Sequence, residues 1–352
     1  TYETKDGILS VTRGEALKIK PYFPNWKPEF VHPDHPIKIR YINNDFPLDE
    51  FQEAAISAMK QHRQGIIHAV TSAGKSLIIC KAIAEIGQRA LIVVHRKILM
   101  EQLLEDIDKY IRDENGEKIK VGTIGNGRNT IGPITIAIDK TLARHIEEHK
   151  ENFGVAILDE CHIAPANTIF TLLNNINAGR RFGLTGTLQR KDQKEFLIFA
   201  TFGTVIARIS KETLLEEGRV VPVNVEILNS STKFDWNQVV TALTEQDEKN
   251  PTVQARHLQE KTIAGDPLRN NLILWKVADL YKAGGKTMIL SRYVEPCYTL
   301  QDQLRALYNI ESGVITGKDS KEALASFEGM KHGDSKVIFA TIGCVSTGVS
   351  IS

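Results

Sequence analysis

The sequence predicts an α/β protein with two parallel-sheet domains in tandem and a small N-terminal accessory element. Short apolar runs alternate with stretches of helical periodicity in two separate parts of the chain. Uninterrupted apolar runs of about 4–8 residues are typical of strands that are buried on both faces of a parallel sheet, as in βαβ units. The length of 352 residues suits two domains of ordinary size.

The accessory element occupies residues 1–45. Its prolines remove backbone donors and interrupt helices, so we expect only short strands, near residues 7–12 and 37–41, and no separate large core. Those prolines are Pro21, Pro24, Pro28, Pro33 and Pro36.

The first large domain spans residues 46–222. We expect a helix over 49–63, followed by apolar runs that are separated by helical stretches. The runs that predict strands are residues 65–70, 90–95, 134–138, 155–158 and 181–184.

The second domain spans residues 223–352, where the pattern resets. A charged helical stretch is expected over 237–282, and Trp275 lies there at helical spacing with apolar neighbours, so we expect its side chain in the core. The strands that should follow are residues 287–290, 312–316 and 336–340.

Composition excludes several classes of protein. Hydrophobic residues make up 42% of the chain and charged residues 25%, which excludes a disordered or collagen-like chain. The net charge of +1 predicts no polyanionic partner by itself, so a nucleic-acid site would need local clustering of basic residues. No apolar run approaches the roughly 18 residues of a membrane span. The four cysteines lack zinc-site spacing, and we expect reduced thiols.

The segment from residue 69 to 76 carries the first chemical signal. It reads Ala-Val-Thr-Ser-Ala-Gly-Lys-Ser, follows a predicted strand and opens a predicted helix. In such a loop, backbone N–H groups face phosphate oxygens, a lysine contacts the β- and γ-phosphates, and a serine hydroxyl binds Mg²⁺. The residues that we expect to bind ATP here are Thr71, Ser72, Ala73, Gly74, Lys75 and Ser76, with Ser76 as a magnesium ligand.

Two adjacent carboxylates, Asp159 and Glu160, follow the predicted strand at 155–158. Ligands gather at the carboxyl ends of strands in a doubly wound sheet, where Asp159 can hold Mg²⁺ and Glu160 can accept a proton from water. Alone, the pair would fit a solvated acidic turn equally well. The neighbours Cys161 and His162 lack the further ligands of a metal site, and we expect His162 to hydrogen-bond within the ATP site.

This combination resembles the superfamily 2 helicases, with a Walker A loop followed by a motif II of the Asp-Glu-Cys-His (DECH box) form. Further motifs follow in order over about residues 48–352. Gln52 stands where the family's adenine-reading glutamine lies. Residues 184–187 resemble motif III, which implies that Thr185, Gly186 and Thr187 couple the ATP site to the cleft between domains.

Other motifs imply contacts with nucleic acid. Residues 93–102 resemble motif Ia, residues 135–142 a second contacting strand end, residues 288–292 motif IV and residues 340–349 motif V. A glycine-rich turn after Val121 can donate backbone N–H groups to a phosphate. The expected contacts are His95, Arg96, Gly125, Arg128, Lys140, Ser291, Arg292, Thr347 and Gly348. None supplies base-edge readout, so we expect binding that is independent of base sequence.

Within the superfamily, the chain is most similar to phage recombination helicases of the UvsW type, with RecG and XPB-like translocases as more distant relatives. The resemblance implies two RecA-like domains and an ATP- and Mg²⁺-dependent enzyme that acts on forked, branched or duplex DNA. It further implies branch migration and fork regression in recombination, repair or replication. We expect a monomer in the cytoplasm, and in the host cytoplasm if a phage encodes it.

Several alternatives stay open at this level. The aromatic residues Tyr22, Phe23, Trp26 and Phe30 fit either a hydrophobic contact with the first domain or an element that stacks on unpaired bases. The same motif II occurs in RNA helicases. A non-hydrolysing, nucleotide-switched regulator of DNA is a further alternative, because the family's motif VI, with its arginine fingers, would lie beyond residue 352. We expect the full protein to continue into that motif.

Overall fold

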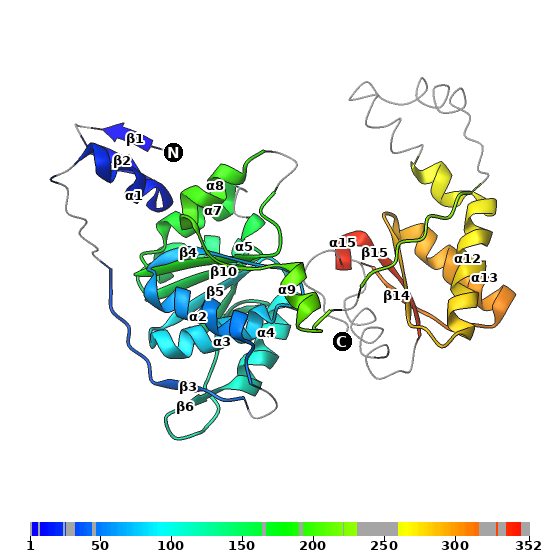
Figure 1. Cartoon of the computed structure of the whole chain (residues 1–352), viewed down its shortest axis with the longest axis horizontal. Coiled ribbons are helices and arrows are strands. Elements are labelled where there is room, and N and C mark those ends of the chain that lie inside the picture. Colours follow the sequence, from blue (N-terminus) through cyan, green and yellow to red (C-terminus); the bar gives the residue numbers. More distant parts are fainter. Residues whose placement is uncertain are drawn as a thin grey trace. The chain divides into compact units, whose positions relative to one another are not determined.

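The computed structural model describes residues 2–5, 8–23, 25, 32–43, 47–163, 167–189, 193–220, 222–230, 260–316, 329 and 336–345. It divides into two compact units, Thr1–Val223 and Asn224–Ser352, each with its own sheet (Figure 1). Both sheets are dominated by parallel strands, so the predicted fold class is confirmed. No helix among the described residues combines the length and apolar composition of a transmembrane segment.

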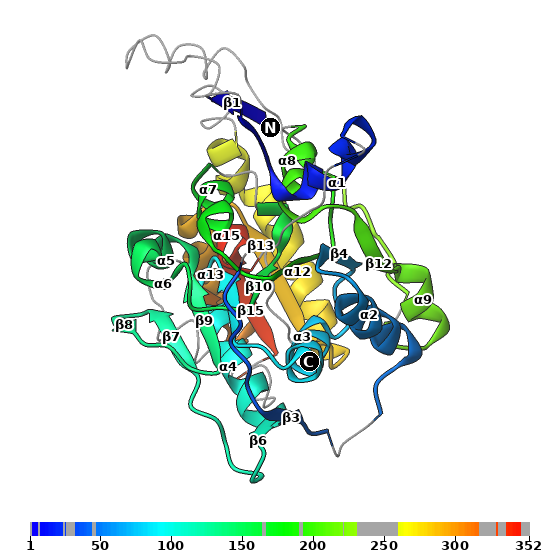
Figure 2. The ribbon, with the colours of Figure 1, turned by 90° about the vertical axis from the view of Figure 1, so that its left-hand side faces the viewer.

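The first unit is built on an eight-stranded sheet in the order β12-β4-β11-β10-β5-β9-β7-β8. All neighbouring strands are parallel except β7 and β8, which form an antiparallel hairpin at one edge, opposite β12 (Figure 2). The strands are β4 (Gln64–Ala69), β5 (Ala90–Val94), β7 (Gly122–Gly125), β8 (Arg128–Asn129), β9 (Ile134–Ile138), β10 (Val155–Asp159), β11 (Arg180–Thr185) and β12 (Val205–Ile209).

Helices cover both faces of this sheet. One face carries α2 (Glu50–Gln61), α3 (Lys75–Ile86) and α4 (Lys97–Tyr110), and the other carries α5 (Asp139–Arg144), α7 (Asn167–Asn175) and α8 (Glu195–Phe202). Short helices α6 (Ile146–His149), η3 (Cys161–Ile163) and α9 (Lys211–Glu216) complete the unit.

Strand β5 shows why these residues form a central strand. All five of its residues are buried, with Ile92 and Val94 in the core under α2–α4 and Leu91 and Val93 in the core on the opposite face. Side chains alternate between the faces of a strand, and burial of each such side chain stabilises the fold by about 1.5–3 kcal/mol. A continuous apolar run is therefore what a two-sided sheet requires.

Within the first unit, the described residues from Tyr2 to Ile42 form an N-terminal strap. After β1 (Tyr2–Lys5), β2 (Ile8–Val11), η1 (Arg13–Glu15), α1 (Ala16–Ile19) and η2 (Lys20–Tyr22), strand β3 (Ile39–Tyr41) pairs antiparallel with β6 (Ile111–Asp113). The Ile37 N–H donates to the Gly87 carbonyl at 2.9 Å, and the Ile42 N–H donates to Tyr110 at 2.8 Å. The strap thus ties together the C-terminal ends of α3 and α4.

Two arginines, Arg180 and Arg181, satisfy carbonyl oxygens where helices end. Arg180 Nη1 donates to Lys60 and His62 at 2.9 and 2.8 Å, beyond α2. Arg181, which is 3% exposed, donates to the Ile176 carbonyl at 3.1 Å beyond α7. Carbonyls at a helix C-terminus lack intrahelical partners and carry partial negative charge, so these guanidinium groups stabilise the ends of both helices.

Arg13 anchors the strap to the rest of the first unit. Its guanidinium donates to Gln64 Oε1 at 2.9 Å and to the carbonyls of Ala178 and Gly179 at 2.5 and 2.6 Å. Burial, together with the charge of Arg63, lowers the pKa of Arg13 to about 10. The neighbouring Gly14 packs so closely on α8 that a Cβ would collide with backbone carbonyl oxygens.

The second unit has a three-stranded parallel sheet in the order β13-β15-β14. Its elements are α12 (Pro267–Lys282), β13 (Thr287–Ser291), α13 (Val294–Tyr308), β14 (Gly313–Ile315), β15 (Val337–Thr341) and α15 (Ile342–Val345). The central strand β15 is buried along its length, and α12 and α13 pack with it in one apolar core.

The prediction that Trp275 is a core residue is wrong, because its side chain is 54% exposed. The buried stripe of α12 consists of Asn270, Leu274, Val277 and Ala278. Successive helical residues are rotated by about 100°, so Trp275 falls outside that stripe by one position.

The Arg13 contacts predict a measurable contribution to stability. Arg13→Ala removes three hydrogen bonds from a charged donor and should lower the unfolding free energy of the first unit by about 2–4 kcal/mol. Urea unfolding measures this change. Arg112→Ala is the matched control, since that exposed guanidinium donates only to nearby carbonyls of Asp108 and Ile111. Equal losses in both variants would show that Arg13 has no special anchoring role.

Candidate nucleotide site and nucleic-acid face

The predicted site residues of the first unit gather along one edge of the sheet. They follow the carboxyl ends of neighbouring parallel strands, which end at Ala69, Thr185, Asp159, Val94 and Ile138 in the order β4, β11, β10, β5, β9. Because these ends lie side by side, the phosphate loop, the Thr-Gly-Thr segment and the carboxylate pair are neighbours. His95, Arg96 and Lys140 follow along the same edge.

The phosphate loop has the backbone that a tight strand-to-helix turn needs. Ser72 and Gly74 both have left-handed backbones, with φ of 71° and 73°, and Gly74 is the N-cap of α3. A side chain at Gly74 would also collide with the Gln52 amide. The glycine is therefore required twice, for its conformation and for the close approach of Gln52.

Gln52 supports this loop in the structure. It is 5% exposed, its Oε1 accepts from the Asp49 N–H at 3.0 Å, and its Nε2 donates to the Ala73 carbonyl at 3.1 Å. The first contact completes the capping box of α2. Both ends of the side chain thus have protein partners, and the adenine contact implied by the resemblance stays a prediction.

Lys75 and Glu160 form an ion pair at the centre of the site. Lys75 Nζ lies 2.5 Å from Glu160 Oε1, and both side chains are largely buried. His162 Nδ1 lies 3.2 Å from the other oxygen of Glu160. Glu160 also has a left-handed backbone, with φ of 56°, a conformation that costs a residue with a side chain on the order of 1–3 kcal/mol. The surrounding contacts hold this carboxylate in a strained position.

The two carboxylates differ in their affinity for protons. Burial raises the pKa of Asp159 to about 6, although the Lys75 charge opposes this. Burial also disfavours ionised Glu160, but the hydrogen bond with His162 and the Lys75 ammonium outweigh it and lower the pKa to about 2. Paired groups whose environments drive their pKa values apart are typical of catalytic sites.

Ser76 and Asp159 fit a magnesium ion by their chemistry. Hydroxyl and carboxylate oxygens are the ligands that Mg²⁺ prefers, and the buried Asp159 carboxylate would be stabilised by a divalent charge. Behind the serine, burial raises the pKa of Asp106 while a hydrogen bond with Ser76 opposes the shift. Asp106 is a site residue that no motif in the sequence indicated.

A hydrogen-bonded network joins the carboxylates to the Thr-Gly-Thr segment. His162 Nδ1 lies 3.0 Å from Thr185 Oγ1, which donates to the Thr187 carbonyl at 2.9 Å and accepts from the Thr187 N–H at 3.1 Å. With Thr185 and Glu160 both as acceptors, the proton of His162 belongs on Nδ1. His68 Nε2 contacts the Gly186 carbonyl at 3.3 Å.

The candidate nucleic-acid contacts of β5 and β9 differ in exposure. His95 is half-buried, and burial followed by the charge of Arg96 lowers its pKa. Lys140 is exposed, and its N–H donates to the buried Asp139 carboxylate at 2.6 Å. The side chain of His95 is thus less accessible to a phosphate than that of Lys140.

The glycine-rich turn after Val121 lies in the β-hairpin of β7 and β8. Gly122 is a buried strand residue, and a Cβ there would collide with the Gly132 backbone. Asn126 and Gly127 form the two-residue connection, with φ of 52° and 75°, as in the tight turns of hairpins. Arg128 follows at once in β8 and is exposed.

In the second unit, the predicted contact Arg292 is already paired. Its Nη1 lies 2.5 Å from Glu260 Oε2, and the Tyr293 hydroxyl donates to the same oxygen at 2.9 Å. The Ser291 hydroxyl accepts from the Tyr293 N–H at 3.1 Å. A phosphate would have to compete with Glu260 for this arginine. Thr347 and Gly348 lie outside the described residues.

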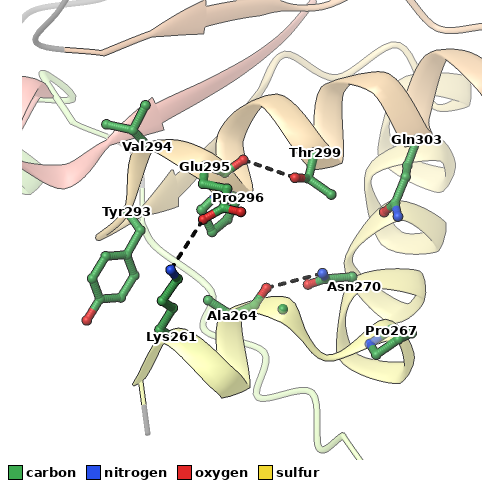
Figure 3. A pocket seen from close by; sticks show the side chains of 11 residues that line it. Lys261, Ala264, Pro267, Asn270, Tyr293, Val294, Glu295, Pro296, Thr299 and Gln303 are labelled. Atoms are coloured by element: carbon green, nitrogen blue, oxygen red, sulfur yellow. Dashed lines mark hydrogen bonds and ion pairs between the residues drawn. The ribbon is translucent and has the colours of Figure 1, made fainter. Parts of the chain in front are cut away.

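A pocket of about 360 Å³ opens beside Tyr293 (Figure 3). Lys261 and Glu295 approach to 3.8 Å in its wall, and Asn270 donates to the Ala264 carbonyl at 3.2 Å. Its polar lining residues are thus largely engaged with one another.

A phosphate loop between a parallel strand and a helix, with carboxylates at a nearby strand end, defines a P-loop nucleotide-binding unit of the RecA type. Residues 45–190 match the family described as "Type III restriction enzyme, res subunit". In fold, the chain is similar to yeast (S. cerevisiae) Dbp5 bound to RNA and ADP BeF3, with a TM-score of 0.54, 13% identity, and coverage of 86% of this chain and 72% of that one.

Two curated relatives match most of the chain. It is 26% identical over 310 residues to the "DNA 3'-5' helicase XPB" of Kineococcus radiotolerans, which covers 84% of this chain and 51% of that protein. It is 22% identical over 310 residues to the "ATP-dependent DNA helicase uvsW" of Enterobacteria phage T4, covering 86% and 59%. Over most of its length the chain is thus similar in sequence to helicases, and it spans between half and three fifths of these relatives' lengths.

The raised pKa of Asp159 predicts a stability effect with a definite pH dependence. The pKa is about 6 in the folded chain and 3.8 ordinarily, so above pH 6 folding includes the cost of ionising a buried acid, up to about 3 kcal/mol. Asp159→Asn should raise the unfolding free energy by that order above pH 6, and the gain should vanish as the pH falls toward 4.

Thermal and urea unfolding from pH 4 to 8 measure this. Asp139→Asn serves as the control, because Asp139 is also a buried aspartate beside a strand end. A gain for Asp159→Asn that does not change with pH would contradict the assignment of the penalty to ionisation.

Proposed function

We propose that this chain is the motor of an ATP-dependent DNA helicase or translocase that acts on forked or branched DNA. The Lys75–Glu160 ion pair beside Asp159, which joins the start of α3 to the residue that follows β10, is the observation that carries the proposal. Lys75, the cation that would contact the phosphates, lies next to Glu160, the carboxylate that would accept a proton. The buried carboxylate of Asp159 is in the same small site. The similarity to a DNA helicase of the XPB kind and to the ATP-dependent DNA helicase uvsW supports DNA as the substrate and ATP as the energy source.

The phosphate loop would hold the ATP phosphates. Backbone N–H groups of this loop, at the N-terminus of α3, would donate to phosphate oxygens; in the structure the Ala73 N–H donates to the Val70 carbonyl at 3.3 Å. Lys75 would leave Glu160 for the β- and γ-phosphates as the nucleotide enters. Glu160 would then lose a main source of its low pKa and become a better acceptor for the proton of the attacking water. Until Lys75 moves, the ion pair disfavours protonation of the Glu160 carboxylate.

Ser76 and Asp159 would hold the magnesium ion. When bound, the ion neutralises charge on the phosphates during transfer. Asp106 would orient the Ser76 hydroxyl through the hydrogen bond between them, and the Glu160 N–H, which donates to Asp159 Oδ1 at 3.0 Å, would orient the carboxylate.

His162 would pass the state of the ATP site to Thr185, Gly186 and Thr187. Its Nδ1 contacts both Glu160 and Thr185. If Glu160 turned toward a water molecule, the contact between His162 and Thr185 would therefore change. Thr187 is the last residue in this series of contacts, and it is exposed. A change in the buried network would therefore reach the surface of the unit at Thr187.

DNA would lie along the edge of the sheet next to the ATP site. Arg96 and Lys140 follow adjacent strand ends, and Arg128 stands on the edge hairpin, while Ser291 and Arg292 would contribute from the second unit. Such side chains contact the phosphate backbone and carry no base information. Selectivity for branched DNA therefore needs another source.

The strap offers that source through two aromatic side chains. Tyr22 is 80% exposed and Phe23 is 47% exposed, although exposure of large aromatic side chains costs free energy in water. Their exposed ring surface could stack on unpaired bases at a fork. Trp26 and Phe30 lie outside the described residues.

The ATP site predicts separate effects on binding and on hydrolysis. Glu160→Gln should bind ATP normally and hydrolyse it at least about 100-fold more slowly, because the proton acceptor is lost. Nucleotide binding and DNA-stimulated phosphate release are the measurements. Glu85→Gln, which affects an α3 carboxylate paired with Lys60 and Lys81, is the control. If Glu160→Gln turns over ATP at the normal rate, the proposed site is wrong.

The strap predicts a selective defect on branched DNA. Replacing Tyr22 and Phe23 with Ala should weaken fork binding about 5-fold or more, since stacking contributes about 1–3 kcal/mol per base, and should leave linear duplex binding unchanged. Deleting residues 1–45 is a poorer test, because it removes β3 and the Arg13 anchor. Tyr298→Ala, at an exposed aromatic of α13, is the control. Full fork preference in the double variant would place junction recognition elsewhere.

A further inference from the structure

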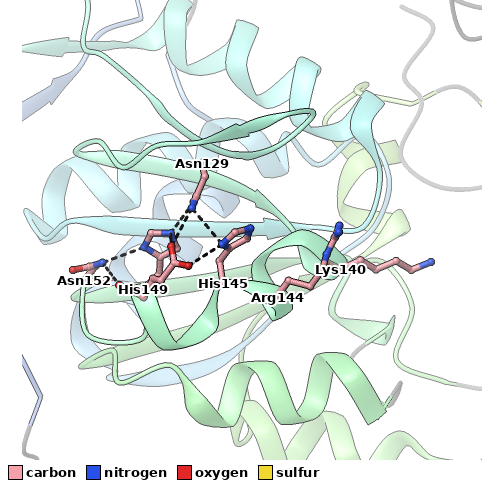
Figure 4. Close-up of polar contacts among 7 residues, drawn as sticks. Asn129, Lys140, Arg144, His145, His149 and Asn152 are labelled. Carbon is pink, nitrogen blue, oxygen red and sulfur yellow. Dashed lines mark hydrogen bonds and ion pairs between the residues drawn. The ribbon is translucent and has the colours of Figure 1, made fainter.

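Asn129 ties the edge hairpin to α6 through a single side-chain amide (Figure 4). Its Nδ2 donates to Glu148 Oε2 at 3.1 Å and lies 3.4 Å from His145 Nδ1. Its Oδ1 lies 2.7 Å from His149 Nε2. One amide from β8 therefore meets three side chains at and around a short helix.

The roles in this network are fixed by Asn152. The Asn152 Nδ2 group lies 3.3 Å from His149 Nδ1 and can only donate, so Nδ1 accepts and the imidazole proton belongs on Nε2. His149 then donates to Asn129 Oδ1. The histidine is 8% exposed, and burial lowers its pKa, which keeps it neutral. Asn129 thus has one acceptor role and one donor role, and only a neutral amide supplies both.

The hairpin needs such an anchor. Strand β8 has two residues, Arg128 and Asn129, which pair with Gly125 and Ile124 at the outer edge of the sheet. Two-residue pairing gives little stability by itself, and residues 126–130 are exposed. The backbone alone therefore leaves the position of Arg128 weakly defined, and the contacts of Asn129 to α6 add the missing constraint.

The basic side chains of α5 lie next to this anchor. Lys140 and Arg144 come from the helix that precedes His145, and Figure 4 shows both extending away from the Asn129 network. Helix α5 packs against β7, so the hairpin and α5 share one corner of the first unit. Arg128, Lys140 and Arg144 are exposed cations at this corner, and the first two are predicted contacts of the proposed DNA face.

We propose that Asn129 is a positioning residue that fixes Arg128 relative to Lys140, so that both cations meet the phosphates of one nucleic-acid backbone. The inference rests on the proposed function, and it identifies the residue that holds the hairpin of Arg128 in place. A fixed arginine loses less conformational freedom on binding than one on a loose hairpin, and so binds more tightly. Asn129 acts through Arg128 and needs no contact with DNA.

The test is a double-mutant cycle on DNA affinity, with the salt dependence measured for a duplex oligonucleotide. Arg128→Ala should reduce the log–log salt slope by about 0.9, the value of one phosphate contact. Asn129→Ala removes no charge, yet it should also reduce the slope and weaken binding roughly 3- to 10-fold, the order that loss of a few hydrogen bonds gives. The double variant should bind no worse than Arg128→Ala.

Asn177→Ala is the matched control. Asn177 also donates from its amide to a surface glutamate, Glu151, at 2.8 Å, and lies after α7, away from the hairpin in sequence and sheet order. It should leave the salt slope unchanged. Thermal unfolding of every variant separates a loss of fold from a loss of position.

Asn129→Asp gives an independent readout through charge. It keeps an acceptor for His149 Nε2 and places a carboxylate opposite Glu148 Oε2, which the native amide contacts at 3.1 Å. Repulsion between the two carboxylates should displace the hairpin and weaken DNA binding at least as much as Asn129→Ala does. Native affinity in Asn129→Asp would contradict the positioning role.

Distinct outcomes separate the two proposals. Failure of the native protein to bind DNA would overturn the proposed function itself. Native binding with additive losses from Arg128→Ala and Asn129→Ala would overturn the positioning role alone, as would an unchanged salt slope in Asn129→Ala. A non-additive cycle, in which Asn129→Asp also binds DNA more weakly than the native chain, supports it.

Discussion

The parallel alignment of β4, β11, β10, β5 and β9 is the constraint on which the rest of the site depends. Because these strands run in one direction, residues that are far apart in sequence reach the same edge, and the helices that follow begin there with their N–H groups unpaired. The Lys75–Glu160 pair, the Thr185 network and the exposed Lys140 all follow from that alignment. The apolar runs that build the strands thereby determine the location of the chemistry.

Sequence patterns were most informative where the chain is buried on both sides. The runs at residues 90–95 and 155–158 became β5 and β10, since continuous apolar segments of that length have few other solutions in a soluble domain. Strand β12 was missed, because its mixed exposure and Arg208 at the sheet edge give no continuous apolar run. The Asn126-Gly127 dipeptide is a signal for a hairpin turn and could have predicted the hairpin of β7 and β8.

The identities of the nucleotide-site residues could be predicted, but their partners could not. Motifs specify residue types at fixed spacing, whereas the hydrogen bond of Gln52 to Ala73, the contact between Asp106 and Ser76, and the pairing of Arg292 with Glu260 depend on tertiary packing. Arg13 is the extreme case, because its partners lie on two separate segments, at Gln64 and at Ala178–Gly179, and satisfy it through carbonyl oxygens. A charged residue among prolines carries no signal of such an arrangement.

The shortness of β8 has a consequence for how this chain behaves at high concentration. The outer strand of an open sheet presents unpaired backbone groups, which can recruit a strand from another molecule and begin aggregation. Here that strand has only two residues, one of them the exposed cation Arg128, and the other bends its amide toward α6. The side of the sheet most open to intermolecular pairing thus ends in a segment too short and too charged to act as a template, which favours solubility.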